Sequence, residues 1–480
     1  MNDWMHRLRR HYEDTRDRYA EHELLLLFDI DGTIVDMRHM VRHVLRGYDE
    51  HHGTAHFRDL ALEDIEVHEN QVDQLPRLEA LPSEERERVR HWYLSRRWQP
   101  EAIFASHRPF EGAMEVIRWF QLQPRTTVAL NTGRPESLRA ETRFLLNALG
   151  EEWRVEFSDD LLFMNDGGWD QDVLPSKVAG VRHYQRLGYH VCAYVDNEPA
   201  NLEAVAGADG TDEILLLHAD TLFESRRERL PGSSVSGRSW RVAPLATEDR
   251  LPRHVRYTWQ AVNDRRSLRR FLNSRVRWAE LDVRWEPRGR VPVVRAEPLS
   301  GRRAEREERV MTLTELLPMI YGRGRAAKLH LHGGEDLIGR VVEVIQDVGV
   351  GSDQLAFRVD PREHEDAAVE WLTRAFPLAW LEAPAGEVAR ALVHRPQEAG
   401  ELLERWRARG VRTLSVPHDL PFLGSMLERL RERGFGVDVQ GAENLETFLR
   451  GVLLLPDSVT ARFGTAGWTG RPGVADASAA

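Results

Sequence analysis

The chain has 480 residues, of which 41% are hydrophobic and 30% charged, a balance typical of packed globular domains and unlike that of disordered or fibrous chains. Its length predicts two to four domains of roughly 100–200 residues each, and its net charge of −11 disfavours a protein that coats nucleic acid or anionic lipid over its whole surface. Without an apolar run of the ~20 residues that span a bilayer, and with a charged N-terminus unlike an export signal, we expect a cytoplasmic protein.

The first half of the chain alternates between helical and strand-like patterns. A charged helix is expected over about residues 2–22, an apolar strand over 24–30 and a charged helical segment over about 41–98. Further apolar strands are then expected at 126–131, 190–195 and 213–219, with helical patterns between the first two. This alternation predicts βα units on a parallel sheet, hence an α/β fold.

The second half has the same alternation with a different rhythm. Residues 221–250 lose periodicity and gain Gly, Ser and Pro, so we expect a linker there. Beyond it, strand patterns recur at 255–262, 278–285, 326–332, 354–360, 377–383, 411–417 and 435–441. Seven strands, with an eighth possible, over about 210 residues favour a (β/α)₈ barrel over 251–463, followed by a disordered tail at 464–480.

Lysine is rare in this chain. It occurs only at Lys177 and Lys328, so arginine supplies the other 64 of the 66 basic residues. A compact ammonium is not interchangeable with a guanidinium, so each lysine is a candidate for a position that requires one. The alternative is a chance remnant of coding bias.

Two aspartates follow the first apolar strand in LLLLFDIDGTIVD. Asp29 and Asp31 are two residues apart, which places both carboxylates on the same side of an extended chain. One can attack phosphorus while the other delivers a proton to the leaving oxygen, provided that a divalent cation balances the charge. The alternative is a strand-ending turn with two solvated aspartates.

Three later segments favour the catalytic interpretation because they supply what that chemistry needs. Thr132 and the turn after it offer a hydroxyl and N–H groups to phosphate oxygens. Lys177 opens a helix, where its ammonium can hold nucleophile and phosphoryl group together, and Asp196 ends the strand HVCAYV, where a carboxylate can bind Mg²⁺.

In this order the four motifs resemble the haloacid dehalogenase (HAD) superfamily over about residues 22–220. The resemblance implies a phosphatase in which Asp29 is the nucleophile and forms an aspartyl-phosphate, Asp31 is the general acid/base, and Thr132 and Lys177 bind the phosphoryl group. Asp196 is then expected to hold Mg²⁺ with Asp29 and the backbone carbonyl of Asp31.

The same resemblance extends to neighbouring residues. Gly133, Arg134 and Asn197 are implied to bind substrate, and residues 37–107 correspond to a helical cap that selects it. The domain would occupy residues 1–220 and act on a small phosphorylated substrate. Residues 132–150 also faintly resemble the 3′-phosphatase half of polynucleotide kinase-phosphatases, without fixing nucleic acid as a substrate.

The second half carries a different set of polar residues. Glu280 and Asp282 in WAELDVRW point the same way, and such a pair can bind a metal near the rim of a barrel. Lys328, His330 and His332 share one face of a strand, and Asp360 is near another strand end, with Glu382 and His418 as further candidates. The alternatives are a functional pocket and a satisfied polar layer inside the barrel.

The context of Glu280 and Asp282 resembles the glycerophosphodiester phosphodiesterase-like superfamily, with its FAM151 (menorin)-like branch the nearer match, over about residues 250–460. That family places catalytic histidines after its first strand and after the ELDV element, whereas residues 258–261 and 294–297 contain none. The barrel is therefore expected either to open a diester whose monoester product the HAD site hydrolyses, or to be a binding module without catalysis.

Overall fold

The computed structural model describes residues 4–168, 172–210, 213–221, 229–286, 291–297, 310–362, 364 and 366–462. Contacts along the chain divide it into two compact units, Met1–Thr247 and Glu248–Ala480. The tail expected at 464–480 lies outside the described residues. Within the described ranges, no helix has both the length and the apolar character that crossing a bilayer requires.

The described part of the first unit contains a six-stranded parallel sheet in the order β3-β2-β1-β4-β5-β6. Its strands are β1 (Leu24–Phe28), β2 (Thr126–Pro135), β3 (Leu162–Asn165), β4 (His190–Asp196), β5 (Leu215–Ala219) and β6 (Val235–Gly237). All five residues of β1 are buried, as expected for a central strand covered on both faces. The carboxyl end of β1 therefore lies between those of β2 and β4.

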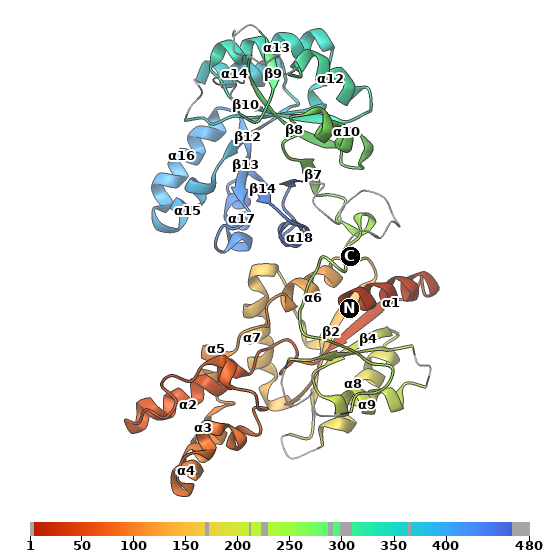
Figure 1. Ribbon diagram of the computed structural model, residues 1–480, viewed down its shortest axis with the longest axis vertical. Helices are drawn as coiled ribbons and strands as arrows, with labels where there is room; N and C mark the ends of the chain where they lie inside the picture. Colours follow the sequence, from red (N-terminus) through yellow and green to blue (C-terminus); the bar gives the residue numbers. More distant parts are fainter. Residues whose placement is uncertain are drawn as a thin grey trace. The chain divides into compact units, whose positions relative to one another are not determined.

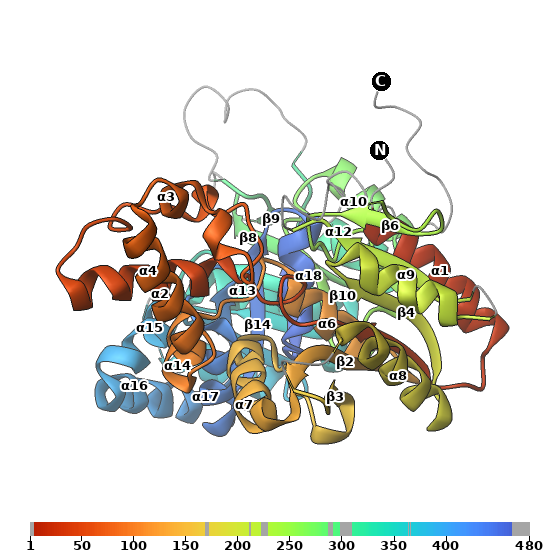
Figure 2. The same ribbon diagram turned by 90° about the horizontal axis from the view of Figure 1, so that it is seen from below.

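Helices cover both faces of this sheet, α8 and α9 on one and α1 and α6 on the other (Figure 1). The four helices and α7 are α1 (Trp4–Arg18), α6 (Ala113–Gln121), α7 (Arg139–Gly150), α8 (Val173–Arg186) and α9 (Pro199–Ala208). Between β1 and β2 the chain leaves the sheet and forms a separate helical group, visible at one side of this unit in Figures 1 and 2. Its helices are α2 (Arg38–His52), α3 (Pro76–Glu79), α4 (Ser83–Arg96) and α5 (Pro100–Ser106).

The described part of the second unit is a closed barrel of eight parallel strands, with β9 paired antiparallel to β8 outside the ring. The ring runs β7-β8-β10-β11-β12-β13-β14-β15 and closes through the β15–β7 pairing. Its strands and β9 are β7 (Arg256–Trp259), β8 (Trp278–Trp285), β9 (Pro292–Val294), β10 (Ala326–Leu331), β11 (Leu355–Arg358), β12 (Trp380–Pro384), β13 (Val411–Pro417), β14 (Gly436–Ala442) and β15 (Ser458–Ala461). The predicted α/β fold class, a parallel sheet followed by a barrel, is thus confirmed.

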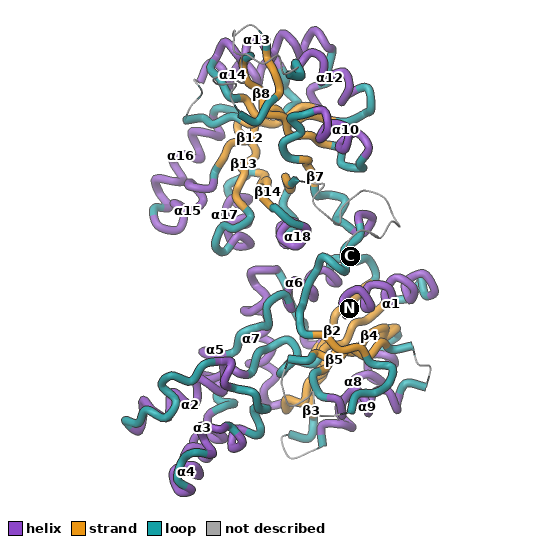
Figure 3. The backbone as a smooth tube through the Cα atoms, in the orientation of Figure 1, coloured by secondary structure: helices purple, strands orange, loops and turns teal. Residues whose placement is uncertain are grey.

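Helices alternate with the barrel strands and form its outer layer (Figure 3). They are α10 (Arg265–Asn273), α12 (Leu313–Tyr321), α13 (Glu335–Val348), α14 (Asp366–Ala375), α15 (Gly386–His394), α16 (Pro396–Ala408), α17 (Leu423–Glu432) and α18 (Leu445–Leu453). Aliphatic residues of β8, β10 and β11 pack against α12 and α13 in one continuous core.

Four strands, β3, β6, β9 and β15, were absent from the sequence-based expectation, and β9 has only three residues. β3 and β15 have only four residues each, too few to establish a period, and β15 is the strand that closes the ring. β6 lies within the segment expected as a linker, where it pairs with β5. Trp240, beyond β6, is also buried, its ring 4.6 Å from that of Trp4.

Candidate functional site

In the first unit, the ends of β1, β2 and β4 bring three polar residues to one edge of the sheet. Asp29 follows β1, Thr132 lies near the end of β2 and Asp196 ends β4, and all three side chains are buried. The backbone N–H of Asp29 donates to the carbonyl oxygen of Val195 over 2.8 Å, which holds the two aspartate-bearing segments side by side.

Lys177 connects these segments from α8. Its Nζ lies 2.5 Å from Asp29 Oδ1 and 3.0 Å from Asp196 Oδ2, and it donates to the carbonyl oxygen of Asn131 over 2.8 Å. The lysine is 1% exposed. Burial raises the pKa of Asp29 to about 8, because the Lys177 ammonium, which acts in the opposite direction, is shared with a second carboxylate.

Asp31 is held by Arg134 rather than by the lysine. Arg134 Nε and Nη2 donate to Asp31 Oδ2 and Oδ1 over 2.7 and 2.6 Å, a bidentate pair, and Nη1 donates to Thr142 Oγ1. Burial acts to raise the pKa of Asp31, but the Arg134 guanidinium outweighs it and holds the pKa below its ordinary value. The guanidinium expected to bind substrate is therefore engaged with Asp31. The Thr132 hydroxyl accepts a hydrogen bond from the backbone N–H of Arg134.

Gly32 and Asn197 bring the segment after β1 and the segment after β4 into close contact. Gly32 has φ +77°, and a Cβ there would lie 2.5 Å from Asn197 Nδ2, so both the turn and the close approach require glycine. Thr33 Oγ1 lies 3.2 Å from Asn197 Oδ1, and Asn197 Nδ2 donates to Glu198. Asn197 thus supports the loop that contains Gly32 and Thr33. Gly133, also expected to bind substrate, lies close to Val173.

The oxygen atoms at this edge suit a hard divalent cation. Three carboxyl groups, those of Asp29, Asp31 and Asp196, lie here with two buried cations, Lys177 and Arg134. Such oxygen donors are those that Mg²⁺ prefers. A bound divalent cation would favour the ionised form of Asp29, whose pKa burial raises. Asp29, Asp196 and the backbone carbonyl of Asp31 are the groups that would hold the ion.

Sequence reasoning missed the residues that orient Asp196. Tyr194 donates its hydroxyl proton to Asp196 Oδ2 over 2.8 Å, and Asn201 Nδ2 and the Glu198 N–H donate to the same carboxylate. Tyr194 is two residues before Asp196 on the same strand, so the two side chains lie on the same face of the sheet. This spacing is the sequence signal that could have identified Tyr194.

The helical segment between β1 and β2 also reaches this edge. His68 lies 3.3 Å from Glu198 Oε1 and 3.3 Å from Glu69 Oε2, and burial raises the pKa of Glu69. Further along, His107 is fully buried, and within the described residues neither ring nitrogen has a hydrogen-bond partner. Burial, together with the charge of Arg134, lowers the pKa of His107 to about 3, so this ring is neutral.

In the second unit, Lys328 is the centre of a buried polar layer inside the barrel. Its Nζ lies 2.9 Å from Glu280 Oε2, 2.9 Å from both oxygens of Glu382 and 3.2 Å from Asp438 Oδ2, and it contacts Thr460 Oγ1. All five side chains are buried. Asp438 and Thr460 were not among the sequence candidates, and Thr460 lies on β15, one of the strands that were not expected.

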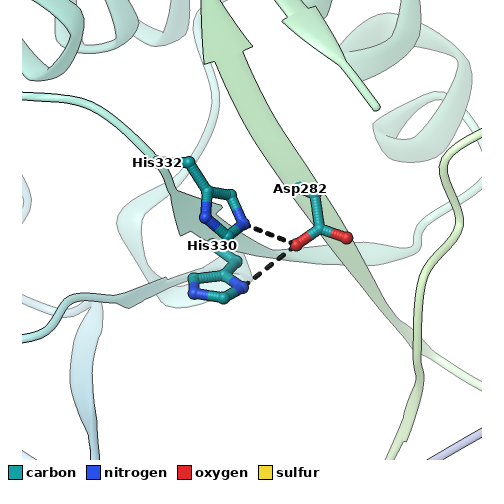
Figure 4. A group of neighbouring side chains, drawn as sticks. All are labelled: Asp282, His330 and His332. Carbon is teal, nitrogen blue, oxygen red and sulfur yellow. Dashed lines mark hydrogen bonds and ion pairs between the residues drawn. The ribbon is translucent and has the colours of Figure 1, made fainter. Parts of the chain in front are cut away.

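A second polar cluster lies two residues further along the same strands (Figure 4). In the register of β8 and β10, Lys328 is opposite Glu280 and His330 is opposite Asp282. Asp282 Oδ1 lies 3.0 Å from His330 Nδ1 and 2.8 Å from His332 Nε2. The predicted pair of Glu280 and Asp282 is thus divided between two layers, and only Asp282 contacts the histidines.

Asp282 is further held by Asn263, whose Nδ2 donates to Asp282 Oδ2 over 2.5 Å. Burial acts to raise the pKa of Asp282, but the hydrogen bonds from the two histidines and Asn263 outweigh it and lower the pKa. Asp360 does not join this cluster, because its carboxylate pairs with Arg362 at 2.7 Å. The backbone N–H of His418, another candidate, donates to Gln440.

Comparisons with known proteins return similar folds of two kinds. No protein-family model and no curated protein matches the chain. An Oleispira antarctica phosphodiesterase, solved with its product sn-glycerol-3-phosphate, is 16% identical and covers 44% of this chain and 94% of its own, with a TM-score of 0.34. A glycerophosphodiester phosphodiesterase from Agrobacterium tumefaciens is 13% identical, covering 43% and 96%, with a TM-score of 0.32.

The second kind is a haloacid dehalogenase-like family hydrolase from Streptococcus pneumoniae. It is 10% identical and covers 45% of this chain and 94% of its own, with a TM-score of 0.28. The solved structures that this chain resembles therefore include both HAD-like hydrolases and phosphodiesterases, each over less than half of its length.

Proposed function

We propose that the first unit is a Mg²⁺-dependent phosphomonoester hydrolase of the HAD type. The observation that carries the proposal is the position of Lys177, whose ammonium joins Asp29 and Asp196 in a buried site at the carboxyl edge of the sheet. A second acid, Asp31, lies at the same edge, where it forms an ion pair with Arg134. A nucleophile, a cation that binds phosphate, an acid/base and a carboxylate for metal are thereby together.

The proposed reaction has two steps. In the first, a carboxylate oxygen of Asp29 attacks phosphorus, the ester P–O bond breaks, and the leaving oxygen takes a proton from Asp31. In the second, water attacks the aspartyl-phosphate, Asp31 takes the proton of that water, and the P–O bond to Asp29 breaks to release phosphate. A bound Mg²⁺ would balance the negative charge of the phosphoryl group.

The arginine pair gives Asp31 a defined state between turnovers. Because Arg134 lowers the pKa of Asp31, this residue is a carboxylate at neutral pH, oriented to accept the proton of the attacking water. For the first step Asp31 must acquire a proton, which favours substrates whose leaving oxygen needs little protonation, such as aryl phosphates.

The helical segment is expected to select a small phosphorylated substrate. The His68 contact to Glu198 and the burial of Glu69 bring this segment to the edge of the catalytic residues. These acidic groups disfavour a long anionic chain such as nucleic acid in the same space.

The test is hydrolysis of an aryl phosphate monoester with and without Mg²⁺. We expect Asp29→Asn to lower kcat by at least about 10³-fold because the nucleophile is removed. Asp17→Asn, the same change at an exposed residue of α1, is the matched control and should keep wild-type activity. Full activity in Asp29→Asn would refute the proposal.

A second activity, cleavage of a phosphodiester in the barrel, is favoured by the cluster of Asp282, His330 and His332. These groups lie in the carboxyl-terminal halves of β8 and β10 or directly after β10, toward the end of the barrel where barrel enzymes have their active sites. They supply imidazoles that the loops expected to carry histidine lack. The test is an aryl phosphodiester with Asp282→Asn rather than a Glu280 variant, because Glu280 supports Lys328. Absence of diester turnover in the wild type would favour a binding module.

A further inference from the structure

The cluster of Asp282, His330 and His332 offers one oxygen and two imidazole nitrogens to a common point. The three ligand atoms all lie within 4.8 Å of one another. The two Asp282 contacts, 3.0 and 2.8 Å, are a few tenths of an ångström shorter than the roughly 3.4 Å that separates ligand atoms around a tetrahedral ion with bonds of about 2.1 Å. Figure 4 shows both imidazoles turned toward the same carboxylate oxygen.

The backbone around this cluster is regular, which makes the arrangement reproducible. His330 and Asp282 are partners in the β8–β10 register, and the backbone N–H of His332 continues that ladder by donating to Val283 over 3.0 Å. Ligands on strands are held more rigidly than ligands on loops. Asn263 hydrogen-bonds to both the carboxylate and the backbone N–H of Asp282, as the outer residues of metal sites do.

Charge also distinguishes this cluster from the buried polar layer around Lys328. Lys328 fills the space among Glu280, Glu382 and Asp438, so that layer already has its cation. The nearest arginine on β11, Arg358, is directed to Glu280 at 3.8 Å. Asp282 is thus the carboxylate of β8 that remains for an ion at the rim.

We propose that Asp282, His330 and His332 bind a divalent transition-metal ion such as Zn²⁺ or Co²⁺. Imidazole is a ligand that these ions accept readily, whereas Mg²⁺ and Ca²⁺ prefer sites made of oxygen. Three protein ligands leave positions for water, and the side chains are 16–27% exposed, so these positions face solvent. The ion differs in kind from the Mg²⁺ proposed for the first unit.

The experiment is a Co²⁺ titration of the full chain after treatment with a chelator, in millimolar Mg²⁺ to occupy the oxygen site. We expect about one equivalent of Co²⁺ to bind, with a visible absorption spectrum typical of imidazole ligation. Asp282→Asn and His330→Ala should each weaken Co²⁺ binding by at least about tenfold. His254→Ala, a change at an exposed histidine of the same unit, should leave it unchanged.

Two further measurements make the outcome decisive. Near-ultraviolet circular dichroism establishes that each variant is folded, and Asp196→Asn reports on the first unit. Loss of Co²⁺ binding in Asp196→Asn with retention in Asp282→Asn would place the ion in the other site and overturn the proposal. A wild-type chain that binds no Co²⁺ in the presence of Mg²⁺ would overturn it whatever the variants do.

Discussion

Replacing Lys328 with methionine tests whether the polar layer inside the barrel is structural. Methionine keeps most of the side-chain volume but removes the ammonium from three carboxylates that lie 2.9–3.2 Å from it. All of these groups are buried, so water cannot replace the lost partner. Removing one member of a buried ion pair typically costs about 3–5 kcal/mol, and we expect a loss of that size in the free energy of unfolding of the barrel at pH 8.

The loss should depend on pH because the remaining carboxylates can take up protons. Burial raises the pKa of Glu382 to about 7, against the opposing charge of Lys328. A carboxyl whose pKa is higher in the folded state binds more protons there, so its contribution to stability declines as the pH rises from about 4.5 to about 7. Without Lys328 this pKa rises further, and the destabilisation should be smaller at pH 5 than at pH 8.

The assay is urea unfolding followed by hydrogen–deuterium exchange of peptides from β10 and β12, which reports on the barrel alone. With a slope of about 2–3 kcal/mol per molar urea, the midpoint at pH 8 should fall by roughly 1–2.5 M. Lys177→Met, the same change in the other unit, is the control and should leave these peptides unaffected. A loss below about 1 kcal/mol, or an equal loss at pH 5 and pH 8, would refute the reasoning.

Three further predictions concern the first unit. Lys177→Met should lower aryl phosphate hydrolysis by at least about 10²-fold with the barrel unchanged, and activity within a factor of two of wild type would count against phosphate binding by this ammonium. Arg134→Gln removes the main group that opposes the effect of burial on Asp31, so the pKa of Asp31 should rise and the acidic limb of the pH–rate profile should move to higher pH; an unmoved limb would separate Asp31 from the proton transfers. His68→Ala should change KM more for a bulky monoester than for a small aryl phosphate, and equal effects on both would argue against substrate selection by this segment.

The sequence allowed the fold class to be predicted and the proposed catalytic residues of the first unit to be named. Strong apolar runs such as Leu24–Phe28 identify buried parallel strands, and the carboxyl ends of such strands meet at one edge of a sheet. Residues directly after them, such as Asp29 and Asp196, therefore come together whatever the loops between them contain. Short strands such as Ser458–Ala461 could not be predicted, because four residues carry too little periodicity.

The tertiary structure alone decided which partner each polar residue has. Arg134 follows the second motif as phosphate-binding residues do, yet Asp31, 103 positions earlier in the chain, takes its guanidinium. No local sequence pattern predicts a contact between residues so far apart in the chain. The Lys328 layer likewise draws on strands that lie far apart in the sequence.

The clearest case is the pair Glu280 and Asp282. In the sequence these carboxylates have the same spacing and the same face, so they form one candidate site. The register of β8 against β10 places Lys328 opposite the first and His330 opposite the second. A buried charge needs its partner within a few ångströms. A difference of two residues in that register therefore makes Glu280 part of the core and leaves Asp282 to the histidines at the rim.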